Sequence, residues 1–276
     1  MSDILTCEIC PRHCRLAEGE IGACRARFND GKKITALNYG AITSIALDPI
    51  EKKPLSKFFP GSRILSVGSY GCNLNCPFCQ NHEISMADST FPTRQISPER
   101  LAELAVELVP EKNIGVAFTY NEPFISYEFV RDTANLLKAV GLKVVLVTNG
   151  TVAPAALKKI LPLIDAMNID LKGFSQEIYS LLGGDFETVR RTIELSAQSC
   201  HVEVTSLIVP TMNDSPEEMA AEAAWLASLS KDIPLHISRF FPHYRVRNLP
   251  PTPVKKIYEL VDIAKEHLNF VYAGNV

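Results

Sequence analysis

Eight cysteines carry most of the metal-binding chemistry that this 276-residue sequence offers. Three of them fall within eight residues, and they are Cys72, Cys76 and Cys79. Four others lie near the N-terminus, and they are Cys7, Cys10, Cys14 and Cys24, while Cys200 stands alone. The first fourteen residues have no basic start, no apolar middle and no small-residue cleavage site. We therefore expect a cytoplasmic protein whose grouped cysteines are metal ligands rather than disulfides.

The cysteine group in the middle of the chain has an unusual ligand count. Its thiols are separated by three and two residues, which places three of them on one short loop. Three thiolates can hold three irons of a 4Fe-4S cubane and leave the fourth iron open, whereas a closed zinc site needs a fourth protein ligand. His82 could supply that ligand, but a zinc site would leave the polar loops described below without a role. The loop therefore favours an iron–sulfur cluster with one iron free for substrate.

The rest of the chain must position this loop. After residue 60, short β-branched apolar runs alternate with amphipathic stretches, which is typical of parallel strands joined by helices. We expect strands at 63–69, 114–119, 144–148, 167–171, 202–209 and 235–241, with a short seventh at 269–272. Six such steps predict an α/β protein built on a partial (β/α)6 TIM-like barrel. A Cys-rich N-terminal extension, residues 1–60, would precede the barrel at 61–276.

Polar residues follow each expected strand at its carboxyl end. They form the cysteine loop and the segments 119–123, 148–150, 170–172, 210–214 and 239–243. In a parallel barrel these loops meet at one mouth, where the active site lies. Each group alone has a simpler explanation, since Glu122 could cap a helix, Lys172 and Asp170 could form a surface ion pair, and Asn149-Gly150 could be a turn. Their occurrence at successive strand ends favours a site.

The cysteine spacing with Phe78 before its last member resembles the radical S-adenosylmethionine superfamily. Glu122-Pro123, Thr148-Asn149-Gly150 and Asp170-Leu171-Lys172 resemble the glycyl-radical activating branch, typified by pyruvate formate-lyase activating enzyme. The N-terminal cysteines, the segment 48–54 and Cys79-Gln-Asn81 are more similar to the radical enzyme of the AmmeMemoRadiSam system, over nearly the whole chain.

The resemblance implies an activity and a set of site residues. A 4Fe-4S cluster on Cys72, Cys76 and Cys79 would reductively cleave S-adenosylmethionine to a 5′-deoxyadenosyl radical, which abstracts hydrogen from a substrate. Glu122 would face the ammonium group of S-adenosylmethionine, Lys172 its carboxylate and Asn149 its ribose. Asp170 and Thr148 would support Lys172 or hold a monovalent cation, and Phe78 would pack on the adenine. His243 is a further cofactor-binding candidate, and His236 is a weaker one.

The resemblance also implies partners. These are a one-electron donor such as flavodoxin or ferredoxin, and either a glycyl-radical protein or Memo-type and AMMECR-type proteins. The substrate is then a protein, for example at a glycine, or a small molecule. A net charge of −3 argues against a nucleic-acid binder, and no apolar run is long enough for a membrane span. The alternative function is a non-catalytic iron–sulfur or zinc protein that transfers electrons or scaffolds partners.

The four N-terminal cysteines are separated by two, three and nine residues, which is close enough for them to form a site without the central cysteines. Four thiols in eighteen residues suit one metal site, and tetrahedral zinc and a second 4Fe-4S cluster both accept four thiolates. Free, redox-labile thiols are the third interpretation. The sequence does not decide among the three.

Overall fold

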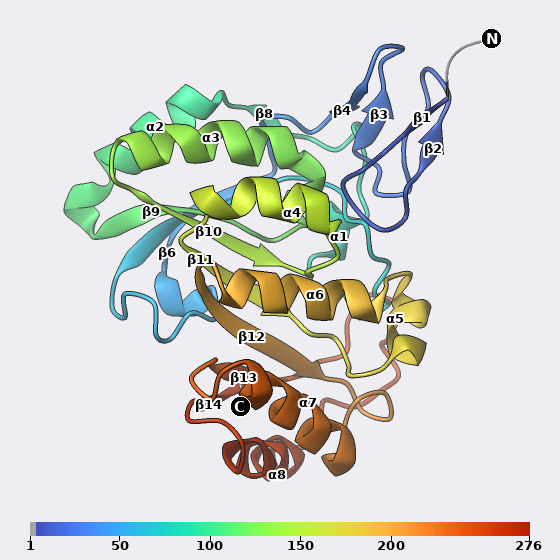
Figure 1. Ribbon diagram of the computed structural model, residues 1–276, viewed down its shortest axis with the longest axis vertical. Coiled ribbons are helices and arrows are strands. Elements are labelled where there is room, and N and C mark those ends of the chain that lie inside the picture. The colour runs from blue at the N-terminus through green and yellow to red at the C-terminus, as the bar shows by residue number, and fades with distance from the viewer. Residues whose placement is uncertain (1–3) are drawn as a thin grey trace.

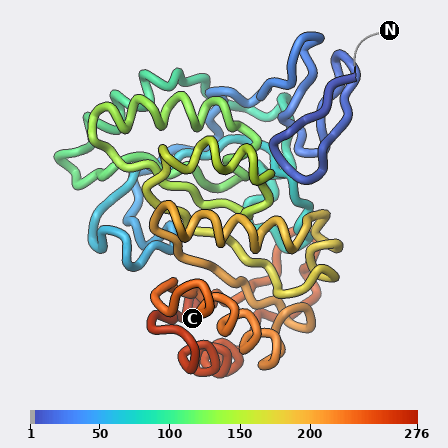
Figure 2. Tube along the Cα trace, in the orientation of Figure 1, coloured from blue at the N-terminus to red at the C-terminus, as the bar shows by residue number. Residues whose placement is uncertain are grey.

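An eight-stranded sheet organises the computed structural model, which describes residues 4–276. The strand order is β14-β13-β12-β11-β10-β9-β7-β6. The strands are β6 (Ser44–Pro49), β7 (Arg63–Gly68), β9 (Asn113–Phe118), β10 (Lys143–Thr148), β11 (Ala166–Asp170), β12 (His201–Ile208), β13 (Leu235–Arg239) and β14 (Val271–Gly274). All neighbours from β7 to β14 are parallel, and successive βα units lie side by side along the molecule, as the colour gradient in Figure 2 shows.

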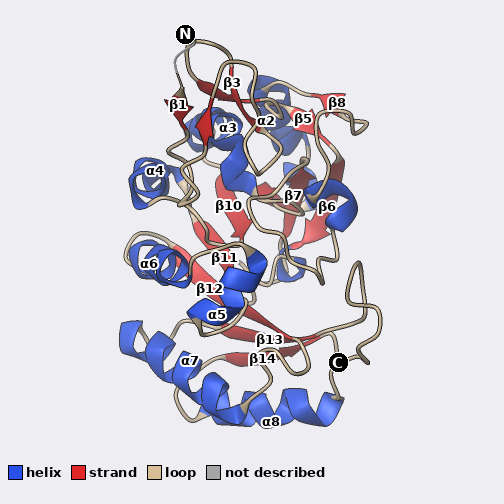
Figure 3. Cartoon of the chain, turned by 90° about the vertical axis from the view of Figure 1, so that its right-hand side faces the viewer, coloured by secondary structure: helices blue, strands red, loops and turns tan. Residues whose placement is uncertain are grey.

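Helices cover the outer face of this sheet (Figures 1 and 3). They are α2 (Pro98–Glu107), α3 (Tyr127–Ala139), α4 (Pro154–Ile160), α5 (Gln176–Leu182), α6 (Phe186–Ala197), α7 (Pro216–Leu229) and α8 (Val254–Lys265), with the short α1 (His82–Ser85) after the cysteine loop. Two of these helices begin as a Ser-Pro pair predicts, because the Oγ of Ser97 and that of Ser215 each accept a hydrogen bond from the third residue of the helix.

The alternation of side chains along each strand separates the core from the interior of the barrel. In β12, Val202 and Val204 belong to the main apolar core, which the helices cover. Glu203 and Thr205 lie on the opposite face, as His236 does in β13. Polar side chains therefore collect on the concave side of the sheet.

The expected α/β partial barrel is confirmed, with each expected strand found within two residues of its predicted ends. The sequence did not reveal β6, which pairs antiparallel with β7 and so belongs to the sheet. This strand lies on the N-terminal side of the expected boundary at residue 60, and the division into 1–60 and 61–276 remains a prediction. Among residues 4–276, no helix has the length and apolar character needed to cross a membrane.

The N-terminal part of the chain forms three small antiparallel pairs. They are β1 (Leu5–Thr6) with β2 (Arg15–Leu16), β3 (Arg27–Asn29) with β4 (Ile34–Ala36), and β5 (Ala41–Ile42) with β8 (Arg94–Gln95). A buried, bidentate ion pair between Arg27 and Glu128 of α3, at 2.6 and 2.9 Å, joins this part to the barrel.

The sheet does not close on itself, because β6 and β14 are its two ends. A segment that we call the strap, residues 50–57, runs across the inner face. The carbonyl of Pro54 accepts a hydrogen bond of 2.9 Å from Asn168, and the backbone N–H groups of Ser56 and Lys57 donate to the Glu203 carboxylate at 2.9 and 2.7 Å. A fully buried carboxylate thus connects the strap to the middle of the barrel.

Two histidines complete the surroundings of Glu203. The Nε2 atoms of His201 and His236 lie 2.9 and 2.6 Å from its oxygens. Burial raises the pKa of Glu203, but these four donors outweigh it and lower the pKa to about 2. The stabilisation by Glu203 is therefore present above its ordinary pKa of 4.5 and is lost as the pH falls toward 2.

We expect Glu203→Gln to lower the free energy of unfolding by about 1–3 kcal/mol at neutral pH, because the amide leaves donors of the strap unpaired. The loss of stability between neutral pH and about pH 3 should be smaller in this variant than in the native protein. Urea unfolding at both pH values measures this. Glu187→Gln is the control, because Glu187 is exposed and we expect a change within about 0.5 kcal/mol. If Glu203→Gln lost as much stability between neutral pH and pH 3 as the native protein, the low pKa of Glu203 would not account for that loss.

Candidate active site

A cavity of about 750 Å³ lies inside the partial barrel, at the carboxyl ends of the strands. It brings together all three cysteines of the central loop and six of the seven residues expected to bind S-adenosylmethionine. These are Cys72, Cys76, Cys79, Phe78, Glu122, Thr148, Asn149, Asp170 and Lys172. Strap residues and the end of β14 line the other side of the same cavity. Four of the six expected loops thus reach the cavity, whereas residues 210–214 and 239–243 do not line it.

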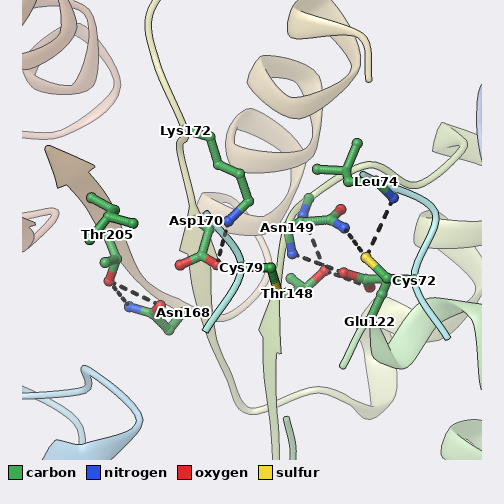
Figure 4. A network of polar contacts seen from close by, with 12 residues as sticks. Cys72, Leu74, Cys79, Glu122, Thr148, Asn149, Asn168, Asp170, Lys172 and Thr205 are labelled. Carbon is green, nitrogen blue, oxygen red and sulfur yellow. Dashed lines mark hydrogen bonds and ion pairs between the residues drawn. The ribbon is translucent and has the colours of Figure 1, made fainter. Parts of the chain in front are cut away.

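The cysteine loop follows β7 and is held by hydrogen bonds from neighbouring elements. The backbone N–H of Leu74 donates to the Cys72 sulfur at 3.4 Å, and Asn149 Nδ2 donates to it at 3.5 Å (Figure 4). The Cys79 sulfur lies 3.1 Å from the hydroxyl of Ser85. Hydrogen bonds to sulfur are typical of thiolates that bind iron and tune the potential of a cluster.

Burial disfavours the negatively charged thiolate form of Cys72 and Cys76. It raises the pKa of Cys72, and the nearby Glu122 carboxylate raises it further. Burial also raises the pKa of Cys76 to about 11, although Lys172 acts in the opposite direction. A bound iron centre would supply the positive charge that the thiolates need.

The donor set fits a cubane better than a single metal ion. Within residues 4–276, no three His, Cys, Asp or Glu side chains are arranged to hold one metal ion. A cubane binds each thiolate through a different iron, so its ligands do not converge on one point. Three thiols that line one cavity, with short polar groups beside them, match this requirement.

Glu122 follows β9 and lies at the bottom of the cavity, fully buried. Its carboxylate accepts hydrogen bonds from the Thr148 hydroxyl at 2.8 Å, the Asn149 backbone N–H at 2.9 Å and the Phe124 backbone N–H at 3.0 Å. The last of these caps the 3-10 helix Pro123–Ser126, so the capping role is real and coexists with a place in the cavity. Burial raises the pKa of Glu122 to about 7, against the effect of these donors. An ammonium group nearby would favour the charged carboxylate.

Lys172 and Asp170 lie at the end of β11, two strands along the sheet from β9 and Glu122. Their charged groups are 3.0 Å apart, and the side chain of Lys172 is 16% exposed (Figure 4). Burial opposes the charge on Lys172, but Asp170 and the Cys76 thiolate outweigh it and raise the pKa of Lys172. Because the pair faces the cavity, a plain surface ion pair does not describe it. The lysine provides a fixed cation near the cysteine loop.

Phe78 and His243 have different positions. Phe78 is buried in a small apolar cluster with Leu74 and Phe240 and also lines the cavity. His243 is exposed and does not line the cavity; its ring lies 5.0 Å from that of His82. The segment that carries His243 packs on the outside of the cysteine loop, where the backbone N–H of Arg245 donates to the Pro77 carbonyl at 2.9 Å. A role for His243 in binding the cofactor remains a prediction.

The sequence did not reveal a polar cluster that reaches the cavity through Tyr120. Asp48, at the end of β6, accepts hydrogen bonds of 2.9 Å from both Lys53 and the Tyr120 hydroxyl. Burial raises the pKa of Asp48, but Lys53 and Tyr120 lower it to about 2. Tyr120 has a left-handed backbone with φ of +71° and lines the cavity. The only signal in the sequence was the acidic and basic segment 48–54, whose partner lies more than sixty residues away.

His236, the weaker candidate, also lies on the cavity wall. Its ring stacks on Tyr272 at 5.1 Å, and both residues line the end of the cavity beside the strap. The weak cofactor candidate of the sequence thus lies at the side of the cavity away from the cysteine loop, bound to Glu203.

Fold and cavity together define a partial-barrel α/β protein with a three-cysteine loop after its first parallel strand. The family model of the radical SAM superfamily matches residues 66–223, more than half of the chain. The protein therefore belongs to the radical SAM superfamily.

Two curated proteins illustrate the relationship. The uncharacterized protein MJ0808 of Methanocaldococcus jannaschii is 39% identical over 274 residues, which is 98% of this chain and 81% of that protein. Pyruvate formate-lyase 1-activating enzyme of Escherichia coli K12 is 26% identical over 170 residues, 57% of this chain and 65% of that enzyme. The homology to activating enzymes expected from the motifs is thus confirmed, while the AmmeMemoRadiSam assignment remains a prediction.

Solved structures show the same fold. SuiB of Streptococcus suis, bound to the precursor peptide SuiA, has a TM-score of 0.59 at 11% identity, over 75% of this chain and 47% of that chain. A radical SAM methyltransferase from Sphaerobacter thermophilus has a TM-score of 0.56 at 16% identity, over 78% of this chain and 67% of that chain. At these identities the likeness concerns the fold alone.

Proposed function

We propose that the protein is an enzyme that binds a 4Fe-4S cluster through Cys72, Cys76 and Cys79 and reductively cleaves S-adenosylmethionine. The observation that carries this proposal is the single cavity that the three thiols share with Glu122, Asn149 and Lys172. A cluster held there would supply the one electron needed to cleave S-adenosylmethionine reductively, and the cleavage would serve to abstract hydrogen from a substrate.

The chain's own residues then bind and orient S-adenosylmethionine. Glu122 accepts hydrogen bonds from its ammonium group, and Lys172 pairs with its carboxylate, since the two side chains line the same cavity as the cysteine loop. Asn149 donates to the Cys72 sulfur and to Asn73, so its amide is held next to both cluster and cofactor. Thr148 and Asp170 fix the acid and the lysine through hydrogen bonds of 2.8 and 3.0 Å.

The wall beside the strap is the proposed place of the substrate. It carries His236, Tyr272 and Thr205, which line the cavity and are not among the residues proposed to bind S-adenosylmethionine. A flavodoxin or ferredoxin supplies the electron, and a glycine in a partner protein is the substrate that the homology to an activating enzyme favours. Memo-type and AMMECR-type partners belong to the same proposal.

Anaerobic incubation of the reconstituted protein with S-adenosylmethionine and dithionite tests the proposed reaction. We expect methionine and 5′-deoxyadenosine in equal amounts, formed only when both reductant and cluster are present. A protein with a verified full cluster that forms no 5′-deoxyadenosine would instead support the alternative of a non-catalytic iron–sulfur protein.

A further inference from the structure

The four N-terminal cysteines come together in the fold although the catalytic cavity does not use them. Cys7, Cys10 and Cys24 are buried, at 4%, 8% and 5% exposure, and Cys14 is partly buried. The backbone N–H of Cys7 donates to the Cys14 carbonyl at 2.9 Å, which pairs the two ends of the first hairpin. A side chain at Gly22 would lie 3.6 Å from the Cys14 sulfur, so the turn leading to Cys24 packs against that cysteine.

Backbone N–H groups point at these sulfurs. The N–H of Arg27 donates to the Cys24 sulfur at 3.4 Å. The backbone N–H groups of Arg12 and Ala26 also hydrogen-bond to the sulfurs of Cys10 and Cys24 respectively. Each donor follows its cysteine by two or three residues, and such N–H···S contacts stabilise thiolates that bind metals.

A buried cation lies beside the same group and has a free donor. Both terminal nitrogens of Arg27 are used, by Glu128 and by the carbonyls of Ile34 and Ile125. Within the described residues its Nε has no hydrogen-bond partner, although Arg27 is only 4% exposed. Cys7 contacts this guanidinium and is among the groups that raise the pKa of Arg27 against the effect of burial. A thiolate at Cys7 would accept the unused N–H.

We propose that Cys7, Cys10, Cys14 and Cys24 hold a second metal centre through four thiolates. The burial of neutral thiols explains neither the donors aimed at the sulfurs nor the unpaired Nε of Arg27. Four thiolates carry more negative charge than zinc or a cubane neutralises, and Arg27 is the adjacent cation. Since no three such side chains of residues 4–276 converge on one point, a 4Fe-4S cluster, whose ligands are more widely spaced, fits these positions better than a zinc ion, which would draw the sulfurs together.

The proposed centre lies against the loop of the catalytic cluster. Gly71, directly before Cys72, has φ of +87°, and a side chain there would lie 2.6 Å from the Cys24 carbonyl oxygen. Arg12, two residues after Cys10, donates to the Asn73 carbonyl at 2.9 Å and to the Gly183 carbonyl at 2.6 Å. Asn73 also lowers the pKa of Cys10 through a side-chain hydrogen bond, against the larger effect of burial. The second centre therefore fixes the backbone on both sides of Cys72.

The decisive experiment uses the full chain with Cys72, Cys76 and Cys79 all replaced by alanine. This variant cannot hold the catalytic cluster, so its metal content does not depend on the proposed function. We expect it to retain either one zinc per chain, without visible absorbance, or iron and acid-labile sulfide in the ratio of one cubane after anaerobic reconstitution. Either metal supports the centre and identifies it. A folded variant that binds neither metal would overturn the proposal.

A further replacement in the same background assigns the ligands. Cys10→Ser should remove the remaining metal, whereas Cys200→Ser should leave it unchanged, because Cys200 is a partly buried cysteine away from both groups. Circular dichroism shows whether each variant is folded. Equal metal content in the two variants would exclude Cys10 as a ligand and defeat the four-thiolate centre.

Discussion

Alanine at any one of Cys72, Cys76 and Cys79 is expected to reduce cleavage of S-adenosylmethionine to the background without cluster. A cubane with one open iron needs a thiolate on each of its other three irons, so the loop has no spare ligand. The cavity offers no replacement thiol, since the other cysteines of the described chain do not line it. The measurements are the visible spectrum of the reconstituted variant and the amount of 5′-deoxyadenosine formed with dithionite.

The matched control is Cys200→Ala, which removes a partly buried thiol outside the cavity. It should keep the cluster spectrum and the native rate. Thermal unfolding of all four variants separates loss of ligand from loss of fold. If one of the three loop variants carries a full cluster and forms 5′-deoxyadenosine at the native rate, that cysteine is not a ligand.

Lys172→Ala is expected to weaken the binding of S-adenosylmethionine by about 10- to 150-fold. This corresponds to about 1.5–3 kcal/mol, the range for a hydrogen bond to a charged group. The lysine lies on the cavity wall with its charge 3.0 Å from Asp170, and the carboxylate of the cofactor would share it. Titration of the reconstituted variant with S-adenosylmethionine gives the dissociation constant.

Lys138→Ala serves as the control for Lys172→Ala. Lys138 also pairs with an aspartate, Asp165 at 2.8 Å, but it lies on the outer surface. Its removal should leave the binding of S-adenosylmethionine unchanged and lower stability by at most about 1 kcal/mol. An unchanged dissociation constant in Lys172→Ala would return the Lys172–Asp170 pair to a purely structural role.

The strands and the cysteine loop could be predicted because their signals are local. β9 and β10 follow from short apolar runs, and the helix at Pro98–Glu107 follows from its Ser-Pro start. Glu122 and Lys172 were predicted to meet because the carboxyl ends of parallel strands converge. The cavity, which both side chains line, confirms this geometric argument.

The elements that the sequence did not reveal depend on partners far away in the chain. β6 contains Asp48 and Pro49 and forms because β7 offers it an antiparallel edge. In the sequence, Glu203 is a charged residue within an otherwise apolar strand. Its burial is explained only by its hydrogen bonds to the strap and to two histidines. His243 illustrates the opposite problem, since a motif placed it near the site and the packing of its loop put its side chain outside the cavity.

The strap also has a consequence for the order in which the molecule assembles. Its contacts join residues 147 positions apart between Ser56 and Glu203 and 114 positions apart between Pro54 and Asn168. Contacts across such long loops carry a large closure entropy, whereas neighbouring strands pair locally. The residues proposed to bind the cluster and S-adenosylmethionine, from Cys72 to Lys172, all lie within strands and loops that can form before the strap closes.

We therefore expect the strap to close last during folding and to open first in the folded protein. Hydrogen exchange at the amides of Ser56 and Lys57 should proceed through a local opening, at a lower free energy than exchange in β10. Equal protection in both places would show that the strap opens only when the whole barrel unfolds. If the strap instead opens locally, the cavity is accessible while the barrel stays folded. A preassembled inorganic cluster could then enter without unfolding of the barrel.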